Sequence, residues 1–258
     1  MTLLILKFGG SVLTNGGAIP SVVQEISRHL SSCDRVIVVV SAFRNQTDAL
    51  ERTALALCPS PGADVLAFYM GLGEMRAAGE LTLGLQGAGI DATLRMPWEV
   101  RLLSIGSPLN AMPVAVSKHA FLNALEERQV VVFPGYLGRG HDGRPHVLGR
   151  GGSDLTAIFL SAELKADRCV LLKDAPGIFE WDPAREGQRP RRYSRISWDD
   201  ASRVGRMLRS ADVEYARSRS VTIEVMGLGA SRSTVVGPGV SEFDPSGEVE
   251  PSKQGPRE

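Results

Sequence analysis

The sequence predicts an α/β fold in which helices cover both faces of a mainly parallel central sheet, a three-layer αβα sandwich. Short apolar runs alternate with longer amphipathic stretches along most of the chain, as in successive βαβ units. Residues 35–40 are hydrophobic almost throughout, which suits a parallel strand buried on both faces. Polar, glycine-rich loops directly follow several apolar runs, at the positions where open sheets of this kind bind ligands.

The predicted elements alternate along the chain. Residues 3–6 form an apolar run that predicts the opening strand, residues 19–30 have a helical pattern, and residues 35–40 predict the second strand. Further along, the same reasoning predicts helices over 64–88, over 118–127 and after Ser153, and strands over 130–133 and 169–172. Because parallel strands need long crossovers, we expect these helices on both faces of the sheet.

The composition is that of an ordinary globular protein. The chain has 258 residues, 43% of them hydrophobic, which is enough for a sizeable core. We expect one folded domain over residues 1–240. Residues 241–258 are rich in Pro, Ser, Gly and Glu, which predicts a disordered tail. The three cysteines form no CxxC pair, so no metal site is expected.

Charge and hydropathy argue against several classes of partner. Lys+Arg and Asp+Glu both total 29, so no general attraction to nucleic acid or to an anionic membrane is expected. The N-terminus lacks the basic and long apolar regions of a signal peptide. No segment reaches the roughly 18 consecutive apolar residues that span a bilayer. We therefore expect a cytoplasmic enzyme with no nucleic-acid or membrane partner.

The first loop of chemical interest follows the opening strand and reads Lys7-Phe8-Gly9-Gly10-Ser11. Glycines let backbone N–H groups approach an anion, and the lysine adds a positive charge, so the loop predicts a phosphate cradle. The P-loop signature GxxxxGK[ST] is absent, and two glycines after a strand more often form only a turn. This motif is weak by itself.

The second loop, residues 149–154 (GRGGSD), precedes a predicted helix. Three glycines at a helix start form an anion-binding nest, in which Ser153 or Asp154 is able to cap the helix. Arg150 adds a planar fork suited to a bidentate contact with a carboxylate. The alternative is a glycine-rich turn with a solvated arginine, which we rank lower because these features coincide.

Two further loops have equally ordinary interpretations. Residues 173–179 (KDAPGIF) begin with a polar pair suited to a nucleotide, and Phe179 offers a ring face. That loop alone is better explained as a turn with a core aromatic. Residues 41–48 (SAFRNQTD) offer hydroxyls and an amide to a small polar substrate. There a helix N-cap at Thr47 or Asp48 is an equally good explanation.

Taken in order, these loops resemble the amino acid kinase family, and most closely the catalytic domain of aspartokinases. The resemblance covers residues 3–239 and rests on KFGGS, VVVSAFRNQTDAL, the pair Gly73-Glu74, LGRGGSD, LLKDAPGIFEWDP and VEYARSRSVTIEV. KFGG is shared across the family, whereas LGRGGSD and the serine-to-aspartate stretch are more specific to aspartokinases. The resemblance implies an N-lobe that binds the amino acid, a C-lobe that binds the nucleotide, and a homodimer.

The resemblance also implies roles for individual residues. It places catalysis on Lys7, Asp154 and Arg206. It places amino-acid binding on Ser41, Thr47, Glu74 and Arg150. It places nucleotide binding on Lys7, Gly9, Gly10, Ser11, Gly151, Gly152, Lys173, Asp174, Phe179 and Arg185.

The implied reaction is the ATP-dependent phosphorylation of the side-chain carboxylate of aspartate, which gives an acyl phosphate. Free carboxyl groups titrate near roughly 4, so the acceptor is already an anion at neutral pH and needs no general base. Lys7, Arg206 and the glycine-loop amides would neutralise charge during transfer. We expect Mg²⁺ to be held mainly by the phosphates of ATP, since the sequence has no paired carboxylate motif for a protein cage.

Several positions depart from the aspartokinase pattern. Lys173 stands where the family usually has threonine, Ala184 interrupts the usual DPR with Arg185 one place later, and Arg206 replaces a phosphate-contacting lysine. No sequence after Gly239 matches the regulatory ACT domains, so feedback inhibition through them is not expected. The alternatives are a kinase of another small acidic or modified amino acid, a nucleotide or isoprenoid phosphate kinase, and a non-catalytic ligand-binding relative.

Overall fold

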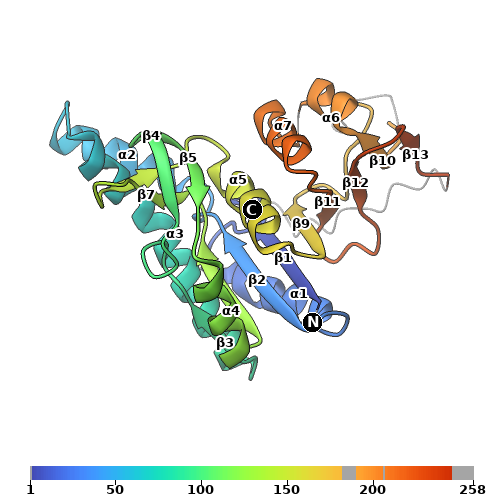
Figure 1. Ribbon diagram of the computed structural model, residues 1–258, viewed down its shortest axis with the longest axis horizontal. Coiled ribbons are helices and arrows are strands. Elements are labelled where there is room, and N and C mark those ends of the chain that lie inside the picture. The colour runs from blue at the N-terminus through green and yellow to red at the C-terminus, as the bar shows by residue number, and fades with distance from the viewer. Residues whose placement is uncertain (1, 182–189, 206, 246–258) are drawn as a thin grey trace.

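Figure 1 shows the computed structural model, which describes residues 2–181, 190–205 and 207–245. Its helices are α1 (Ile19–Leu30), α2 (Gln46–Leu57), α3 (Ala63–Gly87), α4 (Lys118–Glu127), α5 (Gly152–Leu164), α6 (Trp198–Val204) and α7 (Ser210–Ser218). Its strands are β1 (Leu3–Phe8), β2 (Arg35–Val40), β3 (Ala92–Leu94), β4 (Leu103–Ser107), β5 (Asn110–Ala115), β6 (Val130–Pro134), β7 (Leu137–Arg139), β8 (Pro145–Val147), β9 (Arg168–Lys173), β10 (Tyr193–Ser197), β11 (Ile223–Gly227), β12 (Thr234–Gly237) and β13 (Glu242–Phe243).

The main sheet has the strand order β13-β10-β12-β11-β9-β1-β2-β6-β3. Strand β1 pairs in parallel with β2 and β9, and β6 pairs in parallel with β2 and β3. Only the pairs β11–β12 and β10–β13 are antiparallel among the described strands of this sheet. The sheet is therefore mainly parallel, and every strand and helix predicted from the sequence is present close to its predicted bounds.

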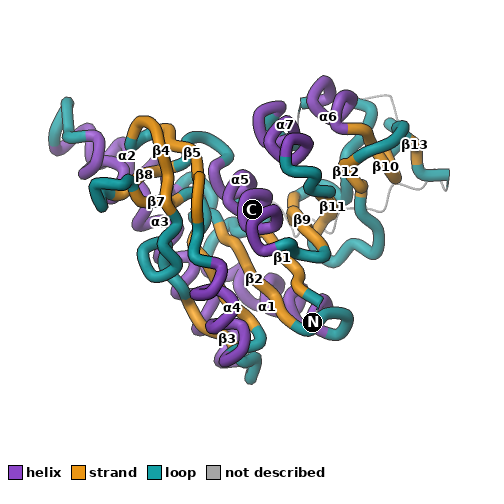
Figure 2. Tube along the Cα trace, in the orientation of Figure 1, coloured by secondary structure: helices purple, strands orange, loops and turns teal. Residues whose placement is uncertain are grey.

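Alternate side chains of β1 divide between the two faces of the sheet. Leu4 and Leu6 pack with residues of α1 and α3 in one buried cluster, whereas Leu3 and Ile5 pack with residues of α4 and α5 in another. Helices thus cover both faces of the sheet (Figure 2), and the predicted three-layer sandwich is confirmed. The same alternation assigns Lys7 to the face on which α5 lies.

A second, smaller sheet is not predicted by the sequence. Its strand order is β5-β4-β7-β8, and it lies with α2 at one end of the molecule, while α6, α7 and β10 lie at the other (Figure 1). Leu66, Met70, Tyr136 and Val147 belong to the small core that joins α3 to this sheet. The strands are short and leave apolar side chains such as Ile105 exposed, so neither length nor alternation marks them in the sequence.

The folded part extends past residue 240, after which the sequence predicts a disordered tail. Strand β13 pairs with β10, and the ring of Phe243 stacks on Tyr193 with 4.4 Å between centroids. Asp244 forms an ion pair with the buried Arg192. Residues 241–245 are therefore packed against the sheet, and the rest of the predicted tail, 246–258, lies outside the described residues.

Among the described residues, no helix is long and apolar enough to cross a bilayer.

Candidate active site

Three charged side chains meet where β1, β9 and α5 come together. Lys7 on β1 lies opposite Leu171 on β9 in the parallel register, and Lys173 follows two residues later, so both lysines face the same side of the sheet. Helix α5 covers that side and carries Asp154 in its first turn. The fold therefore gathers residues from distant parts of the sequence at the carboxyl edge of the sheet, where α/β folds bind ligands.

Asp154 forms ion pairs with both lysines. Its Oδ1 lies 2.6 Å from Lys7 Nζ, and its Oδ2 lies 2.6 Å from Lys173 Nζ. Burial alone would raise the pKa of Asp154, but the attraction of Lys7 and Lys173 holds that pKa at about 2. Burial also lowers the pKa of Lys7, and Asp154 opposes this only in part. Asp154 is therefore a carboxylate throughout the neutral pH range.

The first glycine loop folds against Lys7. A Cβ on Gly9 would lie 3.0 Å from Lys7 Nζ, so a larger residue would crowd the ammonium. Gly10 lines the adjoining cavity. The carbonyl of Ser11 accepts a hydrogen bond of 2.8 Å from the Arg44 guanidinium, which ties this loop to the one after β2. The backbone and Lys7 together form a positively charged edge, as a phosphate cradle requires.

The second glycine loop begins α5. Gly151 is the N-cap, with φ of 75° and no side-chain hydrogen bond to the helix. The predicted cap at Ser153 or Asp154 is wrong, because the Asp154 carboxylate pairs with the lysines instead. A Cβ on Gly151 would lie 2.4 Å from Arg209 Nε, and Arg209 itself donates hydrogen bonds of 2.8 and 2.6 Å to the buried Asp212. At the start of α5, the Gly152 N–H donates to the Gly149 carbonyl at 3.0 Å and the Asp154 N–H to the Gly151 carbonyl at 2.9 Å. Among the described contacts the Ser153 N–H has no acceptor, so this donor is suited to an anion.

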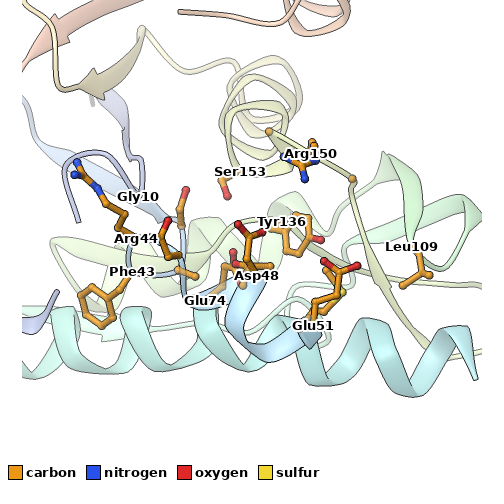
Figure 3. A pocket seen from close by; sticks show the side chains of 18 of the residues that line it. Gly10, Phe43, Arg44, Asp48, Glu51, Glu74, Leu109, Tyr136, Arg150 and Ser153 are labelled. Atoms are coloured by element: carbon orange, nitrogen blue, oxygen red, sulfur yellow. The ribbon is translucent and has the colours of Figure 1, made fainter. Parts of the chain in front are cut away.

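A cavity of about 460 Å³ opens beside the two loops (Figure 3). The predicted residues in its walls are Lys7, Gly10, Ser41, Thr47, Glu74, Arg150, Gly151 and Gly152. The predicted residues that do not line it are Gly9, Ser11, Asp154, Lys173, Asp174 and Phe179. Arg150 and Ser153 lie along one wall in Figure 3. Three acidic side chains lie along the opposite wall: Asp48, Glu51 and Glu74.

Glu74 is the most buried of these acids. It is 3% exposed, and within the described part of the chain its Oε2 has no hydrogen-bond partner. Burial raises the pKa of Glu74 to about 8, and the backbone N–H of Ala42 and the charge of Lys7 oppose this only in part. An ammonium group bound in the cavity would stabilise the ionised form. Glu74 is therefore well placed to recognise an amine.

The cavity walls also contain residues that were not assigned to the site from the sequence, among them Arg44, Asp48, Glu51 and Tyr136. Thr47 and Glu51 are four residues apart on α2 and therefore lie on the same face of that helix. Once the helix is recognised, Glu51 can be predicted to lie beside Thr47. Asn45, with φ of 62°, is the N-cap of α2, so neither Thr47 nor Asp48 caps it. Tyr136 has no signal in the sequence, because it reaches the cavity through the unpredicted smaller sheet.

The predicted nucleotide loop after β9 reaches the site only in part. Lys173 contacts Asp154, but Asp174 is exposed outside the cavity walls. Phe179 is 5% exposed, and its backbone bridges to Arg192, so the structure favours the core-aromatic alternative for its ring. Two further predicted residues, Arg185 and Arg206, lie outside the described residues.

Sequence comparison points to one family. A model of the amino acid kinase family matches residues 2–217. The chain is 31% identical over 232 residues to aspartokinase 2 of Bacillus subtilis, an alignment that covers 87% of this chain and 56% of that protein. It is 30% identical over 230 residues to an aspartate kinase of Pseudomonas putida, with 88% and 56% covered. The chain thus spans a little over half the length of these curated relatives.

Solved structures agree with the sequence comparison. Aspartate kinase from Synechocystis has a TM-score of 0.78 at 29% identity, covering 93% of this chain and 40% of that one. UMP kinase from Bacillus anthracis has a TM-score of 0.64 at 15% identity, covering 94% and 98%, a likeness that shows the fold alone. Since the family match takes in both glycine loops, the cavity residues and the main sheet as far as β10, this chain belongs to the amino acid kinase family.

Proposed function

We propose that this chain is an ATP-dependent kinase that phosphorylates the side-chain carboxylate of aspartate. The observation that carries the proposal is the distribution of charge around the cavity. Lys7 and the glycine loops lie at one edge, and Arg150 faces the buried Glu74 across it (Figure 3). The aspartate kinases among the relatives support aspartate as the acceptor.

The two walls of the cavity match a zwitterionic amino acid. The guanidinium fork of Arg150 suits an α-carboxylate, and the Glu74 carboxyl, whose Oε2 has no hydrogen-bond partner among the described residues, suits an ammonium group. Ser41 and Thr47 add hydroxyl groups to the same cavity. An acceptor held by its α-carboxylate and its amine would direct its side-chain carboxylate toward Lys7 and the glycine loops.

Phosphoryl transfer at that edge needs positioning and neutralisation of charge rather than a base. The acceptor carboxylate is already ionised. Its oxygen attacks the γ-phosphorus of ATP in line, the bond from that phosphorus to the β,γ-bridging oxygen breaks, and ADP leaves with the electron pair. Lys7 and the N–H groups at the start of α5 would stabilise charge on the transferring group. The product is an acyl phosphate.

Two carboxylates near Lys7 already have cationic partners. Asp154 is paired with two lysines, and Asp212 is paired with Arg209. This donor set fits a nucleotide whose own phosphates carry Mg²⁺, where the ion would screen their negative charge.

A phosphate monoester is a poorer acceptor for this cavity. Asp48, Glu51 and Glu74 would repel the dianion of a nucleotide or isoprenoid phosphate, even though Lys7, Arg44 and Arg150 line the same cavity. Another small acidic or modified amino acid would fit the same cavity walls as aspartate. The experiment therefore has to distinguish aspartate from such an acceptor.

An ADP-release assay with ATP, Mg²⁺ and a panel of acceptors tests the proposal. We expect the highest kcat/KM with aspartate, a lower value with glutamate, and no turnover with UMP. N-acetylaspartate is also expected to be inactive, because it lacks the ammonium that Glu74 would bind. Turnover of a modified acidic amino acid but not of aspartate would support the alternative acceptor. Absence of turnover with every carboxylic amino acid would contradict a kinase of this class.

A further inference from the structure

Lys173 occupies an unexpected place for a residue of the nucleotide loop. It ends β9 beside β1, and its side chain turns to the same face of the sheet as Lys7. Its Nζ lies 2.6 Å from Asp154 Oδ2, while Lys7 Nζ lies 2.6 Å from the other oxygen of that carboxylate. Two ammonium groups from neighbouring strands therefore share a single counter-ion.

This sharing leaves positive charge uncompensated in a buried place. The side chains of Lys7, Lys173 and Asp154 are 6%, 12% and 9% exposed. Within the described part of the chain, Asp154 is the ion-pair partner of both lysines, so the trio carries a net positive charge. Desolvated charge without a partner is unfavourable, and a ligand that brings negative charge would relieve it.

Each lysine also retains hydrogen-bonding capacity. An ammonium has three N–H donors, and the described contacts of Lys173 use one of them, to Asp154. The Ser153 N–H, in the first turn of α5 beside Asp154, has no acceptor among the described contacts, whereas its neighbours at Gly152 and Asp154 donate to loop carbonyls. Lysine donors, helix N-terminus and glycine loops therefore form one anion-binding arrangement at the carboxyl edge of the sheet.

We propose that Lys173 is a second cation for the transferring phosphoryl group, acting beside Lys7 with Asp154 as the counter-ion that both lysines share. The proposal rests on the kinase function proposed above. The family resemblance assigns Lys173 to nucleotide binding, whereas this proposal assigns it to the phosphoryl-transfer step. As the bond to the bridging oxygen breaks, charge moves toward ADP, and a cation fixed at this place would stabilise that shift.

The test compares Lys173→Met with a matched surface control, Lys118→Met. The side chain of Lys118 is 52% exposed and pairs with Glu163 at 3.4 Å, away from the cavity walls. We expect Lys173→Met to lower kcat about 100-fold, as for other single donors to developing charge. Its affinity for ADP should stay within about threefold of wild type, and Lys118→Met should change neither quantity.

Binding of ADP with aluminium fluoride and Mg²⁺, a mimic of the transferring phosphoryl group, supplies a readout that folding alone would not move. Lys173→Met should weaken this complex by about the same factor as kcat, since both report stabilisation of the transferring group. A reduced melting temperature with unchanged kcat would assign Lys173 a structural role and overturn the proposal. An equal loss of affinity for ADP and for the fluoride complex would assign it to nucleotide binding, which overturns it too.

The proposal can be tested even if Lys173→Met does not fold or if wild-type protein shows no turnover. If Lys173→Met does not fold, Lys173→Thr introduces the residue that aspartokinases usually carry there, and the same outcomes apply. If wild-type protein turns over no acceptor, the proposed function fails, and the fluoride complex alone decides on Lys173. Tighter binding of that complex by wild type than by the variant supports the proposal, and equal binding overturns it.

Discussion

At the scale of single residues, Lys7 fixes a positive charge at the first glycine loop, 2.6 Å from Asp154 Oδ1. Lys7→Ala removes that charge and leaves the glycine-loop amides in place. We expect kcat to fall about 10²- to 10³-fold, as when one donor to developing charge is lost. ADP affinity should change by less than about tenfold, since the amides still bind the phosphates. Steady-state kinetics and an ADP titration measure both, and an unchanged kcat would remove Lys7 from the transfer step.

Arg150 is an exposed residue on the wall opposite the acids, so its effect should concern the acceptor. We expect Arg150→Ala to raise the KM for aspartate about 10- to 100-fold, because charge-assisted hydrogen bonds contribute about 1.5–3 kcal/mol. The KM for ATP should change much less. Arg128→Ala is the control, since Arg128 pairs with Asp91 at the surface. Unaltered KM and kcat/KM for aspartate in Arg150→Ala would exclude Arg150 from the acceptor site.

At the scale of elements, the start of α5 depends on glycine at position 151. Its φ of 75° disfavours any Cβ, and a Cβ there would also lie 2.4 Å from Arg209 Nε. Gly151→Ala should cost about 1–2 kcal/mol of stability from the left-handed conformation. It should also lower kcat/KM at least about tenfold, because displacement at the helix start disturbs the anion-binding N–H groups.

Gly229 offers a control of the same conformation. Its φ is 73°, but nothing lies within 4 Å of a Cβ built there. Gly229→Ala should therefore lose a similar amount of stability, about 1–2 kcal/mol, while kcat/KM stays near wild type. Urea unfolding and steady-state kinetics on both variants check this. Equal activity in the two variants would show that close approach at Gly151 does not matter to function.

The elements differ in how well the sequence predicts them. Four strands are buried on both faces, namely β1, β2, β6 and β9. Each therefore appears in the sequence as a continuous apolar run, from which the strand can be predicted. Strands β7 and β8 have three residues each, and β5 is largely exposed. The positions of β7 and β8 depend on tertiary contacts with α3, which no local pattern in the sequence reports.

At the scale of the whole molecule, the site is predictable where it consists of loops at strand ends. Lys7 and Ser41 converge on one cavity because the parallel strands β1 and β2 end at the same edge, and Thr47 follows Ser41 closely along the chain. Arg150 reaches the same cavity from β8 of the smaller sheet. The contact of Lys173 with Asp154 was not predictable, since it depends on the register of β1 against β9 and on how α5 lies over them. Two acids of the opposite wall, Asp48 and Glu51, depend on α2, a helix for which the sequence offered only an N-cap at Thr47 or Asp48 as an alternative.

Burial of Glu74 makes stability depend on pH. Its pKa is raised from 4.5 to about 8, so between these values the folded protein retains a proton that the unfolded chain has released. The free energy of unfolding of wild type should therefore fall relative to that of Glu74→Gln as pH rises through this window. The slope is at most about 1.4 kcal/mol per pH unit, and the difference should level off above pH 8.

Urea unfolding of both proteins at several pH values between 5 and 9 measures this dependence. Added aspartate should reduce it in wild type, because an ammonium beside Glu74 favours the ionised carboxyl. A stability difference between the two proteins that stays constant with pH would show that Glu74 is ionised throughout the range.

The proposed chemistry is tested most directly by trapping its product. An acyl phosphate reacts with hydroxylamine to give a hydroxamate, which forms only if a carboxylate has been phosphorylated. With ATP, Mg²⁺ and aspartate, we expect wild type to produce aspartyl hydroxamate in amounts equal to the ADP released, and Lys7→Ala to produce far less. ADP release in the presence of aspartate without any hydroxamate would contradict phosphorylation of the side-chain carboxylate.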